Sequence, residues 1–152
     1  MSDTLSLQQF LPYRCNRLAE QISVSLSKIY VDQFGIGVAE WRILVTLSQE
    51  GELRAKKIGQ LTNMDKVRVS RAVSALSGKK LLKRRNCDTD SRATILSLNA
   101  AGKRLYQRIA PQALSWESSL LEPLSKAEQQ ALFRIIGKLE GRLAELDGLS
   151  RT

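Results

Sequence analysis

The side chains with the most chemical potential in this chain are basic, and they are concentrated in one segment. Residues 52–108 hold fifteen lysines and arginines and four acidic residues, which gives this segment a net charge of +11. The rest of the chain holds nine basic and eleven acidic residues. Such a concentration favours a polyanion as the partner, because each phosphate that a cation neutralises releases bound counterions.

The sequence offers little for catalysis or for metal binding. It contains no histidine, the commonest general base and metal ligand, and its cysteines, Cys15 and Cys87, form no CxxC motif. We therefore expect no enzyme activity, no metal and no cofactor. Because no run of 18 apolar residues and no basic N-terminal leader occurs, the sequence predicts a cytoplasmic protein without a membrane partner.

Within the basic segment, two short helices are predicted in the proportions of a helix-turn-helix. They cover residues 55–61 and 66–79 and are separated by a turn at 62–64. Asp65 is a favourable N-cap for the second helix, because its carboxylate can accept from a free backbone N–H of the first turn.

The second of these helices carries a mixed polar face. Helical spacing turns Val69, Val73 and Leu76 toward a core and leaves cations, hydroxyls and one apolar side chain outside. The resulting candidates for contact with DNA are Lys66, Val67, Arg68, Ser70, Arg71 and Ser74. In the major groove arginine reads guanine bidentately, serine bonds to base edges and an apolar side chain touches the thymine methyl. The alternative is an ordinary solvated helix face.

A β-hairpin is predicted directly after this helix. Residues 81–85 and 93–98 have the composition of two short strands around a charged loop. The first strand ends in three consecutive basic residues, of which we expect Arg84 and Arg85 to contact DNA. A basic hairpin beside the polar helix face makes a plain solvated surface a weaker explanation. No other strand is predicted, so the fold class is mainly α.

Longer helices are predicted on either side, over residues 7–33, 39–49, 100–120 and 126–146. Pro12 must then lie in a first turn, Pro111 should kink its helix, and Gly148 should end the last one. The last helix begins with the capping box Ser125-Lys126-Ala127-Glu128.

The first and last helices have apolar surface to spare. The last one carries a stripe at alternating spacings of four and three, formed by Leu132, Ile136, Leu139, Leu143 and Leu146. The first one has two adjacent apolar stripes, which suggests burial against more than its own domain. Both features predict a homodimer. The alternative is that these helices pack within one chain.

Several motifs occur together in a recognisable order. They are Glu40-Trp41-x-x-Leu44, Val69-Ser70-Arg71-x-Val73-x-x-Leu76, Leu81-Leu82-x-Arg84-Arg85, Asp88-x-Asp90-Ser91-Arg92 and Leu98-Asn99-x-x-Gly102. In this order and spacing the sequence resembles the MarR family of winged helix-turn-helix transcriptional regulators over nearly its whole length. Two positions depart from the family pattern. Asn99 stands where threonine is usual, and Lys80 stands where glycine usually precedes the wing, so that turn is expected to be held differently.

The resemblance implies a winged helix-turn-helix with N- and C-terminal dimerisation helices. It implies a single domain over residues 1–152, with the DNA-binding region at 35–100 and dimerisation helices at 1–34 and 101–152. Arg92 matches the wing arginine that enters the minor groove, and Asp90 matches the acid that holds it by a charge-assisted hydrogen bond. The alternative for this pair is a plain salt bridge in the hairpin.

The resemblance also implies an effector site. Relatives in the family respond to small aromatic acids, and Tyr13, Arg14, Arg17, Tyr30 and Trp41 combine aromatic walls with cations for a carboxylate. A tryptophan on an apolar helix face, such as Trp41, is more often a core residue than the wall of a ligand site. Cys15 offers a thiol input as in some relatives, but its surroundings match that subgroup poorly, so we expect a buried, inert thiol instead.

Together these features predict a sequence-specific DNA-binding regulator. As a homodimer it would bind double-stranded DNA at a pseudopalindromic operator, and it would act as a repressor that a small-molecule effector releases. Two alternatives stay open: an architectural DNA-binding protein without an effector, and a redox-sensing regulator acting through Cys15.

Overall fold

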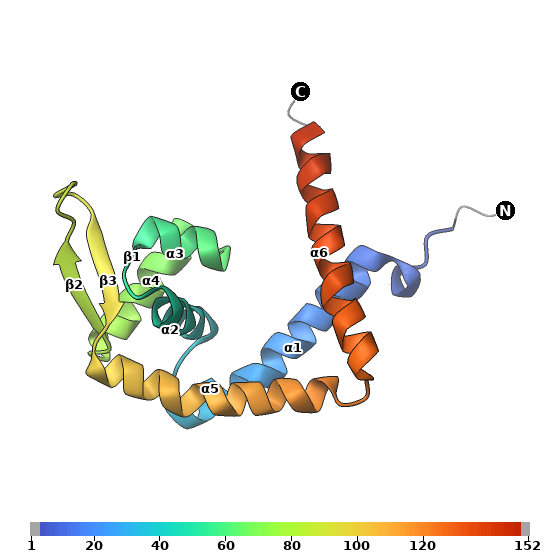
Figure 1. The fold of residues 1–152 in the computed structure, drawn as a ribbon, viewed down its shortest axis with the longest axis horizontal. Coiled ribbons are helices and arrows are strands. Elements are labelled where there is room, and N and C mark those ends of the chain that lie inside the picture. Colours follow the sequence, from blue (N-terminus) through green and yellow to red (C-terminus); the bar gives the residue numbers. More distant parts are fainter. Residues whose placement is uncertain (1–3, 150–152) are drawn as a thin grey trace. The chain divides into compact units, whose positions relative to one another are not determined.

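The computed structural model of the protein describes residues 4–149 and is mainly helical, as predicted (Figure 1). Its elements in chain order are the 3-10 helix Leu7–Gln9, α1 Leu11–Phe34, α2 Val38–Glu50, β1 Leu53–Arg54, α3 Ala55–Thr62, α4 Lys66–Gly78, β2 Leu82–Asn86, β3 Thr94–Leu98, α5 Ala100–Leu121 and α6 Lys126–Leu149. The chain divides into two compact units between Ala113 and Leu114, within α5. The prediction of a single domain stays a prediction.

The ends of the helices follow from local chemistry. Gly35 and Gly51 end α1 and α2 with positive φ angles of 64° and 85°, which glycine adopts without steric cost. Asp65 caps α4 by accepting a hydrogen bond of 2.8 Å from the backbone N–H of Arg68, as predicted. The Ser125 capping box is formed in both directions, at 3.0 and 3.1 Å.

Two predictions about helix limits need correction. The first helix begins at Leu11 rather than at residue 7, because Pro12 is tolerated in a first turn, and Leu7–Gln9 form a separate 3-10 helix. Gly148 does not end α6, which continues to Leu149, since a glycine inside a helix weakens it without breaking it. Helix α5 continues through Pro111, where the kink stays a prediction.

The core of the first unit holds α4 against α2 and α3. Ile43, Leu44 and Leu47 of α2 meet Ile58 of α3 and Leu76 of α4, and each of these side chains is at most 2% exposed. Ile43 is completely buried. Burial of this order is the main stabilising term of the fold and fixes the direction of the outer face of α4.

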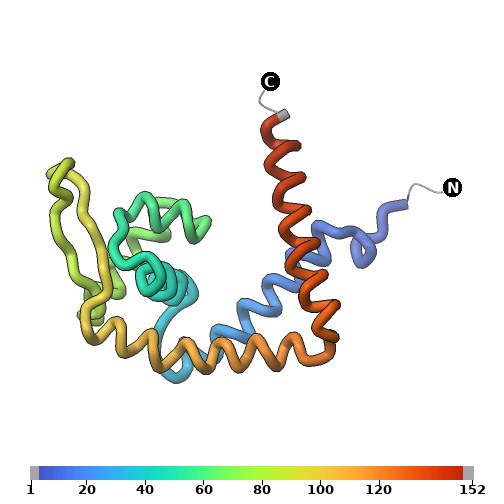
Figure 2. The backbone as a smooth tube through the Cα atoms, in the orientation of Figure 1, coloured from blue at the N-terminus to red at the C-terminus, as the bar shows by residue number. Residues whose placement is uncertain are grey.

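The sheet has three strands in the order β1-β3-β2, all antiparallel. Leu53 pairs with Leu96, and on the other side of β3 Arg85 pairs with Ile95. The prediction that the hairpin contains all the strands was wrong, because β1 lies outside it. This strand was missed because two residues are too few to show a periodic pattern. In Figure 2 the loop between β2 and β3 projects from the end of the sheet that is distant from the start of α5.

None of the helices between residues 4 and 149 is both long and apolar enough to cross a membrane. Within the same residues, no three side chains of His, Cys, Asp or Glu are grouped so that they could hold a metal ion.

Candidate nucleic-acid interface

Helix α4 presents a continuous polar face to solvent. All six predicted contact residues on it are exposed, including Val67 with 60% of its surface accessible. Its other face is buried through Val69, Ala72, Val73 and Leu76. Lys66, Arg68 and Arg71 take part in none of the ion pairs of the described residues. Three cations without an acidic partner at the surface of one helix are available for phosphates and base edges.

A hollow of about 590 Å³ lies between this face and the start of α2. Gly37, Val38 and Ala39 line one side, and Arg68 and Arg71 line the other. Its lining also includes the acids Glu40 and Asp65, so the hollow combines small apolar groups with side chains of both charges beside the exposed face of α4.

One ion pair links the start of α2 to the end of α4 beside this hollow. The ammonium group of Lys79 lies 2.6 Å from the carboxylate of Glu40, whose side chain is 14% exposed. The same glutamate lies 3.4 Å from the backbone N–H of Gly37, which precedes α2. Glu40 thus connects the start of α2 with the C-terminal end of α4.

The two departures from the family pattern meet where α4 is joined to the wing, the hairpin of β2 and β3: Lys80 lies in the connecting turn, and Asn99, which follows β3, contacts it. Lys80 occupies the left-handed region with φ 58°, so it adopts the conformation for which glycine is usual. The amide Nδ2 of Asn99 donates to the Lys80 carbonyl at 2.7 Å, and its Oδ1 accepts from the backbone N–H of Gly102 at 2.8 Å. Threonine has no amide donor for the first of these bonds. Asn99 therefore caps α5 and also fastens the turn at Lys80.

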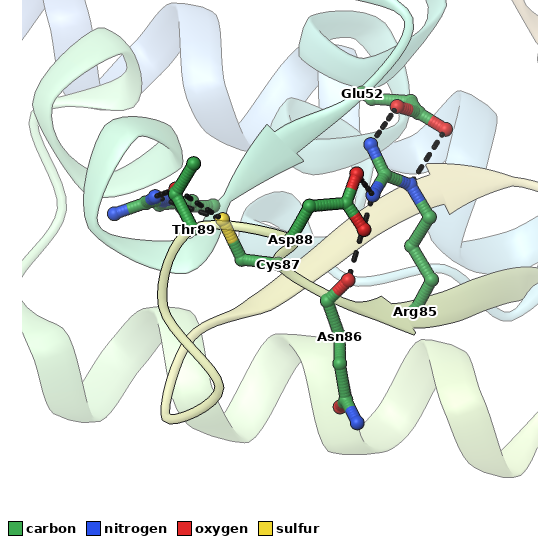
Figure 3. A network of polar contacts seen from close by, with 7 residues as sticks. Glu52, Arg85, Asn86, Cys87, Asp88 and Thr89 are labelled. Atoms are coloured by element: carbon green, nitrogen blue, oxygen red, sulfur yellow. Dashed lines mark hydrogen bonds and ion pairs between the residues drawn. The ribbon is translucent and has the colours of Figure 1, made fainter.

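The strand geometry separates two residues that the sequence had grouped. Arg84 pairs with Leu96, which is 2% exposed, and its guanidinium donates to the Ser77 hydroxyl at 2.8 Å. Because side chains alternate along a strand, Arg85 lies on the opposite face. It donates to both carboxylate oxygens of Glu52, at 2.8 and 3.3 Å, and lies 3.7 Å from Asp88 (Figure 3). Both arginines are thus already engaged within the chain.

The electrostatics of the exposed Glu52–Arg85 pair agree with its geometry. The hydrogen bond from Arg85 and its positive charge lower the pKa of the Glu52 carboxyl. Conversely, the hydrogen bond to Glu52 raises the pKa of the Arg85 guanidinium. The pair is fully charged near neutral pH and holds Arg85 on the outer face of the sheet, so a contact between Arg85 and DNA would compete with Glu52.

Hydrogen bonds to backbone groups shape the wing tip, the loop of residues 87–93 between β2 and β3. Asp90 and Arg92 belong to a turn closed by a 3.0 Å hydrogen bond from the Ala93 N–H to the Asp90 carbonyl. The carboxylate of Asp90 accepts from the backbone N–H of Arg92 at 3.0 Å, rather than from its guanidinium as expected. The plain salt bridge that was the alternative is likewise absent from the ion pairs of the described residues. The acid shapes the turn and leaves the Arg92 side chain exposed.

A cluster of three polar side chains, Arg54, Cys87 and Thr89, at the start of the wing tip was not predicted from the sequence. The Arg54 guanidinium donates to the Cys87 Sγ at 2.9 Å and lies 3.4 Å from the Thr89 hydroxyl, and Cys87 is only 8% exposed. Hydrogen bonds from the hydroxyl and the backbone N–H of Thr89 lower the pKa of Cys87 to about 7, and Arg54 contributes in the same direction. The only signal in the sequence was the basic charge of Arg54, since its strand was not predicted.

The predicted effector residues fall into two groups on the helices. Tyr30 stacks on Trp41 with ring centroids 5.7 Å apart, and Trp41 stacks on Tyr106 at 6.2 Å. Tyr30 is 1% exposed, so its ring lies in the core. Arg17 precedes Tyr30 on α1 by a length of about 20 Å at 1.5 Å per residue. Within one chain α1 therefore keeps Tyr13, Arg14 and Arg17 away from the Tyr30–Trp41 stack.

The thiol and the apolar surfaces of the outer helices are also placed. Cys15 is exposed, which contradicts the expected buried thiol, because the first half of α1 contacts little else in the first unit. In α6 none of residues 126–148 is buried, and Phe133, Ile136, Leu139 and Leu143 are 41–59% exposed.

Comparison with known proteins matches this geometry to one family. Residues 34–93, which run from the end of α1 to the wing tip, match the MarR family. A MarR/EmrR family transcriptional regulator from Acinetobacter sp. ADP1 is 30% identical, with 93% of this chain and 99% of that chain aligned at a TM-score of 0.84.

Two further solved structures share the fold at 20% identity. Sco3205 from Streptomyces coelicolor, solved in complex with DNA, aligns over 92% of this chain and 90% of its own with a TM-score of 0.81. PcaV from the same species, solved with its natural ligand, aligns over 93% and 98% with a TM-score of 0.76. On these likenesses, and with the winged helix-turn-helix geometry above, the chain belongs to the MarR family of DNA-binding transcriptional regulators, a family without enzymatic activity.

Proposed function

We propose that this chain acts as a homodimeric repressor that binds one pseudopalindromic operator in double-stranded DNA. The observation that carries the proposal is the exposed face of α4, where Lys66, Arg68 and Arg71 have no acidic partner among residues 4–149 and lie beside the Ser70 and Ser74 hydroxyls. A helix of this composition fits the major groove, where cations bond to guanine and to phosphates.

Support for the dimer comes from the outer helices. Leu18 and Val24 of α1 are 54% and 57% exposed, and α6 carries its own row of exposed apolar side chains. Large exposed apolar patches on small proteins commonly mark a protein interface. A twofold axis would then place two copies of α4 about one turn of DNA apart, which requires an operator with half-sites in opposite directions.

The test is DNase footprinting on the DNA upstream of the protein's own gene, followed by titrations with Arg71→Ala. We expect one protected pseudopalindrome, and we expect the variant to weaken operator binding by about 1–3 kcal/mol while relaxing the preference at one base position. Arg104→Ala is the matched control, because Arg104 is an exposed cation of the basic segment on α5. Diffuse protection along the DNA would instead support an architectural protein. An equal loss of affinity on operator and on random DNA would make Arg71 a phosphate contact.

The proposal extends to release by a small aromatic acid. PcaV, which shares the fold, was solved with its natural ligand. Because α1 separates Arg14 and Arg17 from the Tyr30–Trp41 stack, one pocket can include both groups only where α1 of a second copy lies alongside. Benzoate added to the operator complex is the probe, and a complex that is stable at millimolar benzoate would argue against this class of effector.

A further inference from the structure

Arg54 occupies a position that connects two parts of the DNA-binding region. It ends β1, where it pairs with Ile95 of the central strand, and it is also the residue that precedes the first turn of α3. Its guanidinium reaches Cys87 and Thr89, which follow β2, the strand at the opposite edge of the sheet from β1. A single side chain therefore joins the start of the helix-turn-helix to the base of the wing loop.

The contact has the geometry of a closed polar cluster. The Arg54 Nη2 lies 2.9 Å from the Cys87 Sγ and 3.4 Å from the Thr89 Oγ1, and the last two atoms lie 3.3 Å apart. Figure 3 shows Cys87 and Thr89 turned toward each other at the base of the loop, while Asp88 lies on the side of Arg85 and Glu52. A short bond from a guanidinium to sulfur is a charge-assisted one when the sulfur is a thiolate.

The wing loop has few other anchors. Residues 88–92 are all exposed, so no apolar contact holds the tip in place, and Cys87 is the buried residue of the loop. Hydrogen bonds within the loop run from Cys87 N–H to the Ala93 carbonyl, from Ala93 N–H to the Asp90 carbonyl and from Arg92 N–H to the Asp90 carboxylate. Asp88 also lies 3.7 Å from Arg85 on β2. These contacts shape the loop and tie it to β2, but none of them reaches the helix-turn-helix.

We infer that Arg54 is a positioning residue for the wing: by holding Cys87 and Thr89 it sets the place of the loop that carries Arg92. The inference rests on the proposed function, in which Arg92 enters the minor groove. Its physical reason is preorganisation, since a loop that is ordered before binding loses less conformational freedom when it enters the groove. The charged groups around the thiol are Arg54 on β1, Arg85 on β2, and Asp88 and Asp90 in the loop.

The experiment compares Arg54→Met, which removes the charge and the donors, with Thr89→Val, which removes a partner hydroxyl and leaves every acidic and basic side chain in place. Both are combined with Arg92→Ala and titrated on operators with A·T-rich and G·C-rich flanks over a salt series. Lys56→Met is the matched control, because Lys56 is an exposed cation two residues further along the chain. Urea unfolding midpoints establish that each variant is folded.

We expect Arg54→Met and Thr89→Val each to weaken binding on A·T-rich flanks by about two- to tenfold, the range for ordering one or two further side chains. The loss on G·C-rich flanks should be smaller, and Arg92→Ala should cost less in either background than in the native protein. For Thr89→Val the salt slope, which is the slope of log affinity against log salt concentration, should stay unchanged. Lys56→Met should affect both flanks alike and leave the cost of Arg92→Ala unchanged.

A second measurement reads the contact without DNA. In a Cys15→Ser background, the ultraviolet absorbance of the thiolate reports the titration of Cys87, which Arg54→Met and Thr89→Val should move to higher pH while Lys56→Met does not. The inference is overturned if the titration does not move. It is also overturned if Thr89→Val is silent on both flanks while Arg54→Met flattens the salt slope by about 0.9, as loss of one phosphate contact would.

The two proposals fail in distinguishable ways. If Arg92→Ala has no effect on either flank in the native background, the wing does not enter the groove, and the role of Arg54 in DNA binding falls with it. If Arg92→Ala selectively weakens binding on A·T-rich flanks but adds fully to Arg54→Met and to Thr89→Val, the wing contact stands and the positioning role is refuted.

Discussion

The turn between α4 and the wing allows a quantitative test, because two departures from the family pattern meet there. Lys80 has φ 58°, a conformation that costs an L-residue about 1–2 kcal/mol relative to the right-handed region. Lys80→Gly removes this cost but gives the unfolded chain more freedom, which offsets about 0.4–1 kcal/mol. We therefore expect the variant to stabilise the protein by about 0.5–1 kcal/mol.

Asn99 supplies the other half of the test. Asn99→Thr restores the usual family residue and keeps an oxygen that can accept from the Gly102 N–H, but it loses the 2.7 Å bond from Nδ2 to the Lys80 carbonyl. Loss of one such bond typically costs about 0.5–1.5 kcal/mol. Since a glycine in place of Lys80 would adopt the left-handed conformation without help, the threonine should cost less in the Lys80→Gly background, by a coupling of about 0.5 kcal/mol.

The assay is urea unfolding of the native protein, both single variants and the double variant. Unfolding is monitored through tryptophan fluorescence, at the same protein concentration for all four proteins. Fixed concentration matters because the stability of a dimer depends on it. An unchanged slope of the unfolding free energy against urea concentration would show that the folded and unfolded states keep their compactness. Destabilisation by Lys80→Gly would refute the strain at this position. Additivity within about 0.3 kcal/mol would refute the coupling.

Three further predictions address the wing, the dimer and the start of α5. Arg92→Ala should weaken binding most on A·T-rich flanks and flatten the salt slope by about 0.9, whereas equal loss on both flanks would indicate a phosphate contact. Leu139→Asp with Leu143→Asp should yield monomer or unfolded chain in sedimentation, because charge buried in an apolar interface costs several kcal/mol, and an unchanged dimer would exclude α6 from the interface. Gly102→Ala should lower the unfolding free energy by about 1–3 kcal/mol, because the added methyl would overlap the Leu81 carbonyl, and an unchanged midpoint would show that α5 can shift.

The polar face of α4 was predictable because its determinants are local. A helix of known start and period has one buried side, and Val69, Val73 and Leu76 identified that side before any tertiary contact was known. The cap at Asp65 fixed the start. Every residue assigned to the opposite face is exposed in the structure. Helical periodicity is enough for such an assignment when both the cap and the core positions are clear.

The wing could not be derived in the same way, because its side chains find partners across the sheet. Arg54 meets Cys87, and Glu52 meets Arg85, in each case 33 residues away in the chain. Both contacts depend on β1, a strand too short to be seen in a sequence pattern, and on the order β1-β3-β2, which places the two edge strands on either side of β3.

Local alternation also decides the roles of neighbouring arginines in a way that composition hides. Arg84 and Arg85 look equivalent in the sequence, yet the strand turns one toward Ser77 at the end of α4 and the other toward Glu52 on the outer face. To contact DNA, Arg84 would have to break its bond to Ser77 and Arg85 its ion pair with Glu52. The two arginines should therefore contribute differently to the free energy of DNA binding. Arg92 has no such partner to leave among the described ion pairs, and Asp90 restrains only its backbone. Of the three wing arginines, Arg92 can therefore enter a groove without breaking an interaction of the free protein. This is a physical reason, independent of the family, to assign it the groove contact.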